Sequence, residues 1–127
     1  MPAAAGFEPG QHNRGRGTSA EAAAVVYLAA QGYEIVAQNV RTDAGEIDVV
    51  ARDGETLCFI EVKARAGERY GPAIEAVDAR KQYRLARAAA LYLVWNPVAV
   101  PCRFDVLGLD HGPDGWAYTL VRDAFQL

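Results

Sequence analysis

This 127-residue chain lacks any long hydrophobic run, although about half of its residues (51%) are hydrophobic. No segment approaches the roughly 18–20 consecutive apolar residues that a membrane-spanning helix needs. The N-terminal stretch, residues 1–17, also lacks the continuous apolar segment of a signal peptide. We therefore expect no membrane partner, and we predict a cytoplasmic location.

Cysteine and histidine are scarce, with two residues of each. Cys58 and Cys102 form no C-x-x-C pair, and His12 and His111 lie in polar, loop-like sequence, so a zinc site lacks ligands at a usable spacing. A surplus of positive charge is missing too, because the formal net charge is −3. This balance argues against a protein that simply coats nucleic acid, but it is compatible with an enzyme whose acidic cluster holds metal cations.

The pattern of apolar residues and turn signals predicts one α/β domain over residues 18–127, preceded by a disordered tail over residues 1–17. One helix is predicted from a Thr18–Glu21 capping box to Gly32, and a second from Ile74 to about Trp95. Strands are predicted at residues 33–40, 46–52, 55–65, 102–109 and 116–125. The simplest architecture for this order is a mixed central sheet of about five strands that is flanked by helices.

Acidic residues gather at one end of the hairpin that Asp53-Gly54 predicts. If these two residues form the loop, Glu46 lies opposite Glu61, and Asp48 is a diagonal neighbour of Glu61. Like charges that face each other destabilise a sheet, so they need a compensating cation such as Lys63 or a divalent metal. The same pattern is open to a second interpretation, a solvated rim with a Glu–Lys pair.

Two sets of motifs resemble those of known families. Asp48, followed on the next strand by Glu61-Val62-Lys63, resembles the D…ExK core of the PD-(D/E)XK nuclease superfamily. The ordered blocks GEIDVVARDG, FIEVKAR, YG, a helix with Lys81 and AAALYL, RFDV and a terminal DAF look like those of the YraN family of small bacterial proteins. That family is similar to archaeal Holliday-junction resolvases. The resemblance covers about residues 17–127 and implies a restriction-endonuclease-like fold.

The resemblance also implies a site for Mg²⁺ or Mn²⁺. Asp48 and Glu61 would bind the metal through their carboxylates, and Val62 through its backbone carbonyl. Lys63 would orient or deprotonate the attacking water, or stabilise the charge that develops on the phosphate. Glu21 resembles the helical glutamate that this superfamily often adds as a metal ligand, but the capping box explains Glu21 equally well.

Basic residues near this site are the candidate substrate contacts. Arg65 and Arg69 follow Lys63 in a predicted loop, where they are placed to contact phosphates of a substrate. Lys81, on the second helix, is a further candidate contact.

Two other charge patterns have structural explanations. Arg80, Arg84 and Arg87 fall on one stripe of the second helix. We interpret this stripe as a solvated face, and phosphate binding is the alternative. Arg103 and Asp105 share a face of the fourth predicted strand, which indicates a structural ion pair.

The combined pattern predicts a Mg²⁺- or Mn²⁺-dependent endonuclease that hydrolyses DNA phosphodiester bonds, with branched or damaged DNA as candidate substrates. A homodimer would suit a two-fold symmetric substrate, by analogy with other enzymes that act on junctions. The alternative is a catalytically inactive protein of the nuclease fold that binds nucleic acid or acts as a scaffold. Metal binding discriminates between the two hypotheses, because an inactive module need not bind Mg²⁺.

Overall fold

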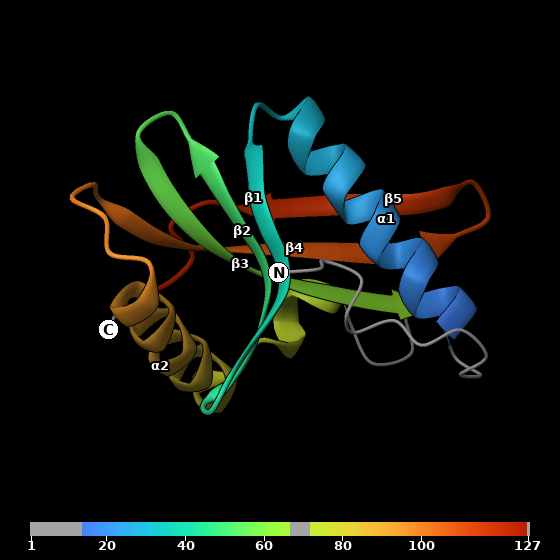
Figure 1. Cartoon of the computed structure of the whole chain (residues 1–127). Coiled ribbons are helices and arrows are strands. Elements are labelled where there is room, and N and C mark those ends of the chain that lie inside the picture. Colours follow the sequence, from blue (N-terminus) through green and yellow to red (C-terminus); the bar gives the residue numbers. More distant parts are fainter. Residues whose placement is uncertain (1–13, 67–71, 127) are drawn as a thin grey trace.

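The chain folds around a five-stranded sheet with a helix packed on each face (Figure 1). The structure, a computed structural model, describes residues 14–66 and 72–126. Its elements are α1 (Arg14–Ala30), β1 (Glu34–Thr42), β2 (Gly45–Asp53), β3 (Thr56–Ala66), the 3₁₀ helix η2 (Ala73–Ala76), α2 (Ala79–Trp95), β4 (Cys102–Gly112) and β5 (Gly115–Val121). The strands lie in the order β1-β2-β3-β4-β5, in which β3 and β4 are parallel and the other pairs are antiparallel. This mixed sheet confirms the predicted α/β class and is consistent with a restriction-endonuclease-like fold.

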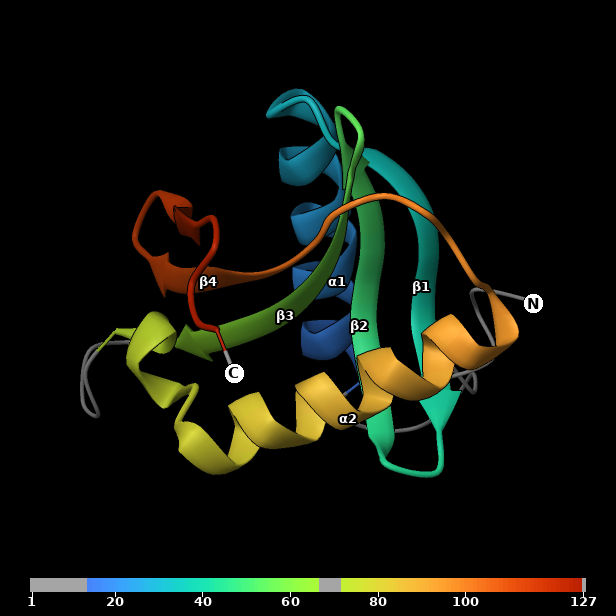
Figure 2. The same cartoon turned by 90° about the vertical axis from the view of Figure 1, so that its left-hand side faces the viewer.

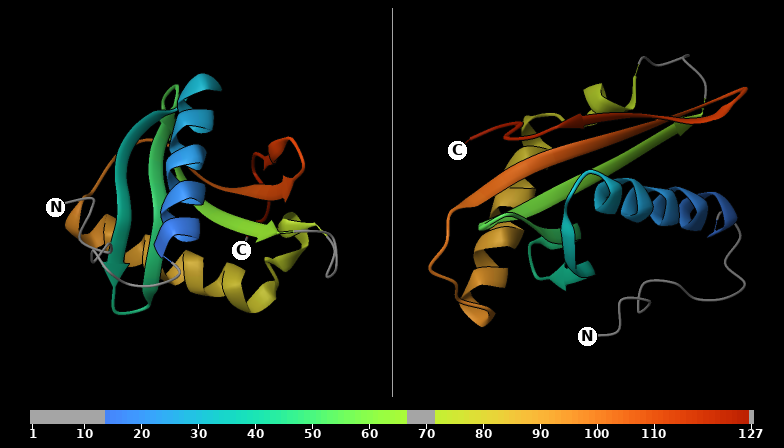
Figure 3. Two further views of the ribbon diagram at one scale, coloured as in Figure 1. Left: turned by 90° about the vertical axis from the view of Figure 1, so that its right-hand side faces the viewer. Right: turned by 90° about the horizontal axis from the view of Figure 1, so that it is seen from above.

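The two helices lie on different sides of the strands. In Figure 2, α2 runs across the end of the β1–β2 hairpin that carries its turn. Figure 3 shows α1 lying along the strands on the other face. No helix within the described ranges is long and apolar enough to cross a membrane.

Helix α1 begins earlier than the capping box predicted. It starts at Arg14, so Thr18 lies inside the helix and is not its N-cap. Residues 14–17 carry no apolar period, which is why the sequence pattern assigned them to the tail; residues 1–13 lie outside the described part of the chain. The predicted end is confirmed, because Gly32 has a φ of 100° and the three amides after the helix, those of residues 31–33, donate back to carbonyls of its last turn.

Small side chains on α1 bring this helix close to the sheet. Ala20, Ala24 and Leu28 recur at a spacing of four residues and are all buried. They pack against Val49 of β2 and Ile60 of β3 in one apolar cluster. The contact fixes the height of α1 above these two strands, and therefore the position of any polar side chain on the same face of the helix.

The β2–β3 hairpin forms where it was predicted, but its register differs by two residues. The strands pair up to Asp53 and Thr56, so the loop is Gly54-Glu55 rather than Asp53-Gly54. Gly54 takes a positive φ of 65° at the first loop position, which glycine adopts without strain. A shift of two residues preserves the face on which each side chain lies, but it changes which residues lie opposite each other.

Strand β2 departs from simple alternation at Asp48. Val49 packs beneath α1, as predicted, but Ile47 packs with Val50 on the α2 side, although alternation places Ile47 with Val49. On β1, Asn39 lies across from Asp48, between the paired positions on either side, and has a left-handed φ of 53°. The irregular backbone at this level turns the Asp48 side chain toward α1.

Helix α2 begins at Ala79 rather than at the predicted Ile74. Asp78 caps it, since a carboxylate oxygen of Asp78 accepts a hydrogen bond from the amide of Lys81 at 3.0 Å. The short 3₁₀ helix η2 precedes this cap and accounts for the residues that the helical pattern had included. The buried positions of α2 face the sheet and are Leu85, Ala88 and Ala89.

Candidate functional site

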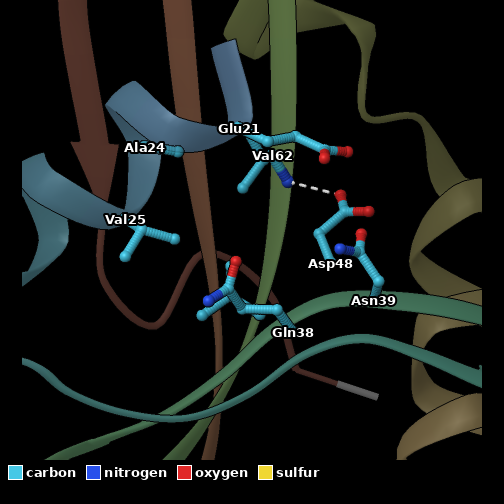
Figure 4. A pocket seen from close by; sticks show the side chains of 8 residues that line it. Glu21, Ala24, Val25, Gln38, Asn39, Asp48 and Val62 are labelled. Atoms are coloured by element: carbon cyan, nitrogen blue, oxygen red, sulfur yellow. Dashed lines mark hydrogen bonds between the residues drawn. The ribbon is translucent and has the colours of Figure 1, made fainter. Parts of the chain in front are cut away.

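A small pocket lies between α1 and the strands β1, β2 and β3 (Figure 4). Glu21 reaches it from α1, Asp48 from β2 and Val62 from β3. In Figure 4 the carboxylates of Glu21 and Asp48 lie on the same side of the β3 strand. The pocket therefore brings together acidic residues that are far apart in the sequence.

Asp48 is held against β3 by its side chain. Its Oδ2 accepts a hydrogen bond from the Val62 amide at 2.8 Å, beyond the last paired residues of the β2–β3 ladder. Burial raises the pKa of Asp48 to about 8, and the negative charges of Glu61, Glu46 and Glu21 add to this effect, while the Val62 amide opposes it. The predicted opposition of Glu46 and Glu61 rested on the wrong register and is itself wrong, but both charges still act on Asp48.

Glu61 lies between the acidic cluster and the cations of α2. Burial raises the pKa of Glu61, and the nearby charge of Glu46 adds to the increase. Positive charges on the other side oppose the increase, and they belong to Lys63, Lys81 and Arg84. Glu61 is thus the residue at which negative and positive parts of the site meet.

Glu21 is free of the helix-capping role that competed for it. Because α1 begins at Arg14, Glu21 lies well inside the helix and cannot satisfy its first amides. Its Oε1 atom is buried and has no hydrogen-bond partner among the described residues. Burial raises the pKa of Glu21, and the charge of Glu46 adds to this. A buried carboxylate oxygen without a partner is costly, so its presence favours an additional ligand at this point.

The residues of this site fit a divalent metal. Carboxylate oxygens of Glu21, Asp48 and Glu61 are the donors that Mg²⁺ and Mn²⁺ prefer. In the ranges that the structure describes, no three acidic, histidine or cysteine side chains are already close enough to enclose an ion. The unpartnered Glu21 oxygen and the raised pKa of Asp48 nevertheless indicate that the pocket holds uncompensated carboxylates. A divalent ion would neutralise their negative charge. Metal binding would require the carboxylates to move closer together.

Two lysines adjoin the acidic cluster on the α2 side. Lys63 lies two residues beyond Glu61 on β3, and its positive charge acts on Lys81 of α2, lowering the pKa of Lys81. The Nζ atom of Lys81 donates to the carbonyl of Ala76 at 3.0 Å, which anchors Lys81 over the end of η2. The structure therefore places both predicted lysines beside the predicted metal ligand Glu61.

The remaining predicted contacts have different outcomes. Arg65 was predicted both as the last residue of the strand at 55–65 and as part of the loop beside the site; it belongs to β3, which extends to Ala66 and pairs with β4 as far as His111. Arg69 lies outside the described residues. The structure shows the Val62 amide in contact with Asp48, and metal binding by the Val62 carbonyl stays a prediction.

Sequence reasoning missed two polar residues that line the pocket. Gln38 and Asn39 of β1 lie beside Glu21 and Asp48, and Asn39 is buried. The available signal was the Gln-Asn pair itself, because asparagine is depleted in strands and enriched among residues with a positive φ. Amide side chains here enlarge the set of polar groups that can orient the carboxylates.

Comparison with known proteins finds one consistent set of relatives. A family model described as "Uncharacterised protein family UPF0102" matches residues 20–109. A UPF0102 protein of Symbiobacterium thermophilum is 51% identical over 112 residues, which cover 87% of this chain and 95% of the relative. Another, of Magnetococcus marinus, is 43% identical over 113 residues and covers 87% and 91% of the two chains. A third, of Chromohalobacter salexigens, is 42% identical over 114 residues, with 90% and 93% covered.

Proposed function

We propose, from the premise that this chain belongs to the UPF0102 family, that it is a metal-dependent nuclease that hydrolyses DNA phosphodiester bonds. UPF0102 is the YraN family that the motifs of the sequence resemble. One observation carries the proposal: the carboxylates of Glu21 and Asp48, the second with a pKa raised to about 8, adjoin Glu61, which in turn adjoins Lys63. A structural role for Glu21 and Asp48 would leave the buried, unpartnered Glu21 oxygen unexplained.

Each residue has a role that its position supports. Asp48, Glu61 and Glu21 would hold Mg²⁺ or Mn²⁺, which supplies positive charge to polarise a phosphate and to activate water. The hydrogen bond from the Val62 amide orients the carboxylate of Asp48 before any ligand arrives. Lys63 lies on the same strand two residues beyond Glu61, so its ammonium can stabilise the charge that develops on the phosphate.

The second candidate is an inactive nucleic-acid-binding or scaffold protein of the same fold. The observation that favours it is that the described carboxylates do not already enclose an ion. The position of Lys63 beside Glu61 argues against this second candidate, because a binding protein without catalytic turnover does not need a lysine at this place.

The decisive experiment combines metal binding with cleavage. Titration calorimetry with Mn²⁺ should detect binding to the parent chain and to Glu34→Gln, a control that removes an exposed carboxylate at the start of β1. Binding should be lost in Asp48→Asn. With Mn²⁺, the parent and the control should cleave at least one member of a panel of linear, flapped and four-way DNA molecules, and Asp48→Asn should cleave none. Metal binding without cleavage of any panel member would favour the scaffold, and absence of metal binding would overturn the proposed function.

A further inference from the structure

Two like charges are held together at the edge of the site. Lys63 of β3 and Lys81 of α2 are near enough for the charge of Lys63 to act on Lys81, and the Lys81 ammonium donates a hydrogen bond to the carbonyl of Ala76 at 3.0 Å. The neighbouring Lys63, together with desolvation, lowers the pKa of Lys81. Neighbouring ammonium groups repel each other, and an anion between them would offset the repulsion, so this pair of lysines is a candidate anion site.

Among the described residues, no carboxylate forms an ion pair at this candidate anion site. The ion pairs found among the described residues involve Arg41, Arg103 and Arg122, and none includes Lys63 or Lys81. Glu61 acts on both lysines through its charge but forms no ion pair of 4.0 Å or less with either. The positive charge of the two lysines is therefore available to a ligand.

Further cations extend from this pair along the exposed face of α2. Arg80, Arg84 and Arg87 are exposed, and none of them takes part in an ion pair found in the described part of the chain. Along the helix axis they are spaced by about 6 and 4.5 Å, which is the scale of successive phosphates on a nucleic-acid strand. By contrast, residues 20–30 of α1 contain no lysine or arginine.

The backbone of β2 makes room for the central arginine. Gly45 begins β2 with a φ of 137°, and a Cβ atom there would lie 3.1 Å from both Cγ and Cδ of Arg84. The stem of Arg84 thus lies over Gly45, and its charge acts on Glu61. Arg84 consequently links the arginine stripe to the anion site between the lysines.

We propose that Lys63 and Lys81 hold one phosphate of a DNA strand, and that Arg80, Arg84 and Arg87 bind neighbouring phosphates of the same strand along α2. The inference rests on the proposed function for the identity of the anion. It adds the surface on which the substrate lies and the direction in which its backbone runs. The contacts are to phosphates, so binding should depend on salt and little on base sequence.

The test measures the affinity of a fluorescein-labelled oligonucleotide by fluorescence anisotropy, as a single strand and as a duplex, in EDTA so that no cleavage occurs. Lys81→Met should weaken binding several-fold and reduce the slope of log affinity against log salt by about 0.7 for the single strand or about 0.9 for the duplex. The triple variant Arg80→Gln, Arg84→Gln, Arg87→Gln should reduce the slope by roughly two to three times that amount. Lys81→Arg, which keeps the charge, should retain most of the affinity.

The matched control is Arg52→Gln, which removes one positive charge from the end of β2 that lies next to the Gly54-Glu55 loop. It should bind as the parent does, and thermal unfolding of every variant checks that the fold is retained. Equal affinity in the parent and the α2 variants, an equal loss in Arg52→Gln, or no salt-dependent binding by the parent would each overturn the inference.

The proposed nuclease activity and this binding surface can fail separately. Salt-dependent binding that requires α2, without cleavage of any panel member in Mn²⁺, would refute the nuclease and leave the surface standing. Cleavage that is undiminished in the triple variant would refute the surface and leave the nuclease standing.

Discussion

Replacing Asp48 with asparagine should stabilise the metal-free protein, and the gain should depend on pH. The pKa of Asp48 is about 8, against an ordinary value of 3.8, so the folded chain binds a proton that the unfolded chain releases at neutral pH. At pH 7 this difference between the folded and unfolded pKa of Asp48 lowers the free energy of unfolding by at most roughly 4 kcal/mol, at about 1.36 kcal/mol for each pKa unit. Asparagine carries no charge, and its side-chain oxygen can still accept the Val62 amide, so the substitution removes this cost.

The sign of the pH dependence follows from the raised pKa. Below about pH 4 the carboxyl group is protonated in both states, and the variant should match the parent. As the pH rises from about 4 to 8, the parent should lose stability relative to Asp48→Asn, and above pH 8 the gap should stay constant. A full effect at pH 7 corresponds to a melting temperature on the order of 10 °C higher in the variant.

Urea denaturation in EDTA at several pH values measures this gap directly. Glu34→Gln is the control, because Glu34 is exposed at the start of β1 and its removal should leave stability unchanged at every pH. Added Mn²⁺ should stabilise the parent and not Asp48→Asn. The reasoning fails if Asp48→Asn is less stable than the parent at pH 7, or if the difference between the two is the same at pH 4 and pH 8.

Three further predictions follow from other parts of the structure. Lys63→Met should keep Mn²⁺ binding by calorimetry but lose cleavage on the order of 10²-fold, and equal rates in both chains would remove Lys63 from the mechanism. Asp105→Asn should cost about 3–5 kcal/mol in urea denaturation, because fully buried Asp105 accepts hydrogen bonds from Arg103 at 2.8 Å and Tyr33 at 2.6 Å. Burial alone would raise the pKa of Asp105, but these hydrogen bonds hold it below its ordinary value of 3.8, so the stability they add should be present above about pH 4 and lost as the pH falls further. Burial raises the pKa of both thiols, that of Cys58 to about 12, so a thiol reagent at pH 8 should modify exposed Cys102 first and Cys58 only after unfolding.

The sequence predicted the elements around the site because their signals are local. The Asp-Gly step located the β2–β3 hairpin, Gly32 located the end of α1, and the spacing of Arg103 and Asp105 predicted the ion pair that the structure contains. Turn residues act through the backbone angles that they favour, so they identify a turn without knowledge of its surroundings.

The exact register was not predictable from the same signals. The Asp-Gly step is compatible with a loop at Asp53-Gly54 and with a loop at Gly54-Glu55, because glycine tolerates a positive φ at either central position. The pairing of β2 with β3 corresponds to the second loop. The turn residues alone do not determine which residues of the two strands pair. The start of α1 was missed for a related reason, since Arg14 begins a helical turn that has no apolar period.

The geometry around Asp48 lay furthest from what the sequence could reveal. Strict alternation placed Asp48 on the α2 face with Glu61, whereas the left-handed Asn39 across from it accompanies a rotation of β2 that turns Asp48 toward Glu21. A deviation of this kind depends on two strands at once, so neither strand's pattern contains it. The resemblance singled out Asp48 all the same, because the position of a motif in the sequence does not depend on the face, and metal binding by Asp48 stays a prediction.

The separation of negative and positive charge around Glu61 would allow an acidic chain to bind a polyanion, as proposed. Glu21 on α1 and Asp48 on β2 form the negative part of the site, whereas Lys81 and Arg84 on α2 form a positive part, and Glu61 lies between them. The net charge of −3 is a sum over the whole chain and does not describe the field at this boundary. A divalent ion bound to the carboxylates would extend the positive region across Glu61. Metal and phosphate would then bind on either side of Glu61, and each would favour the binding of the other.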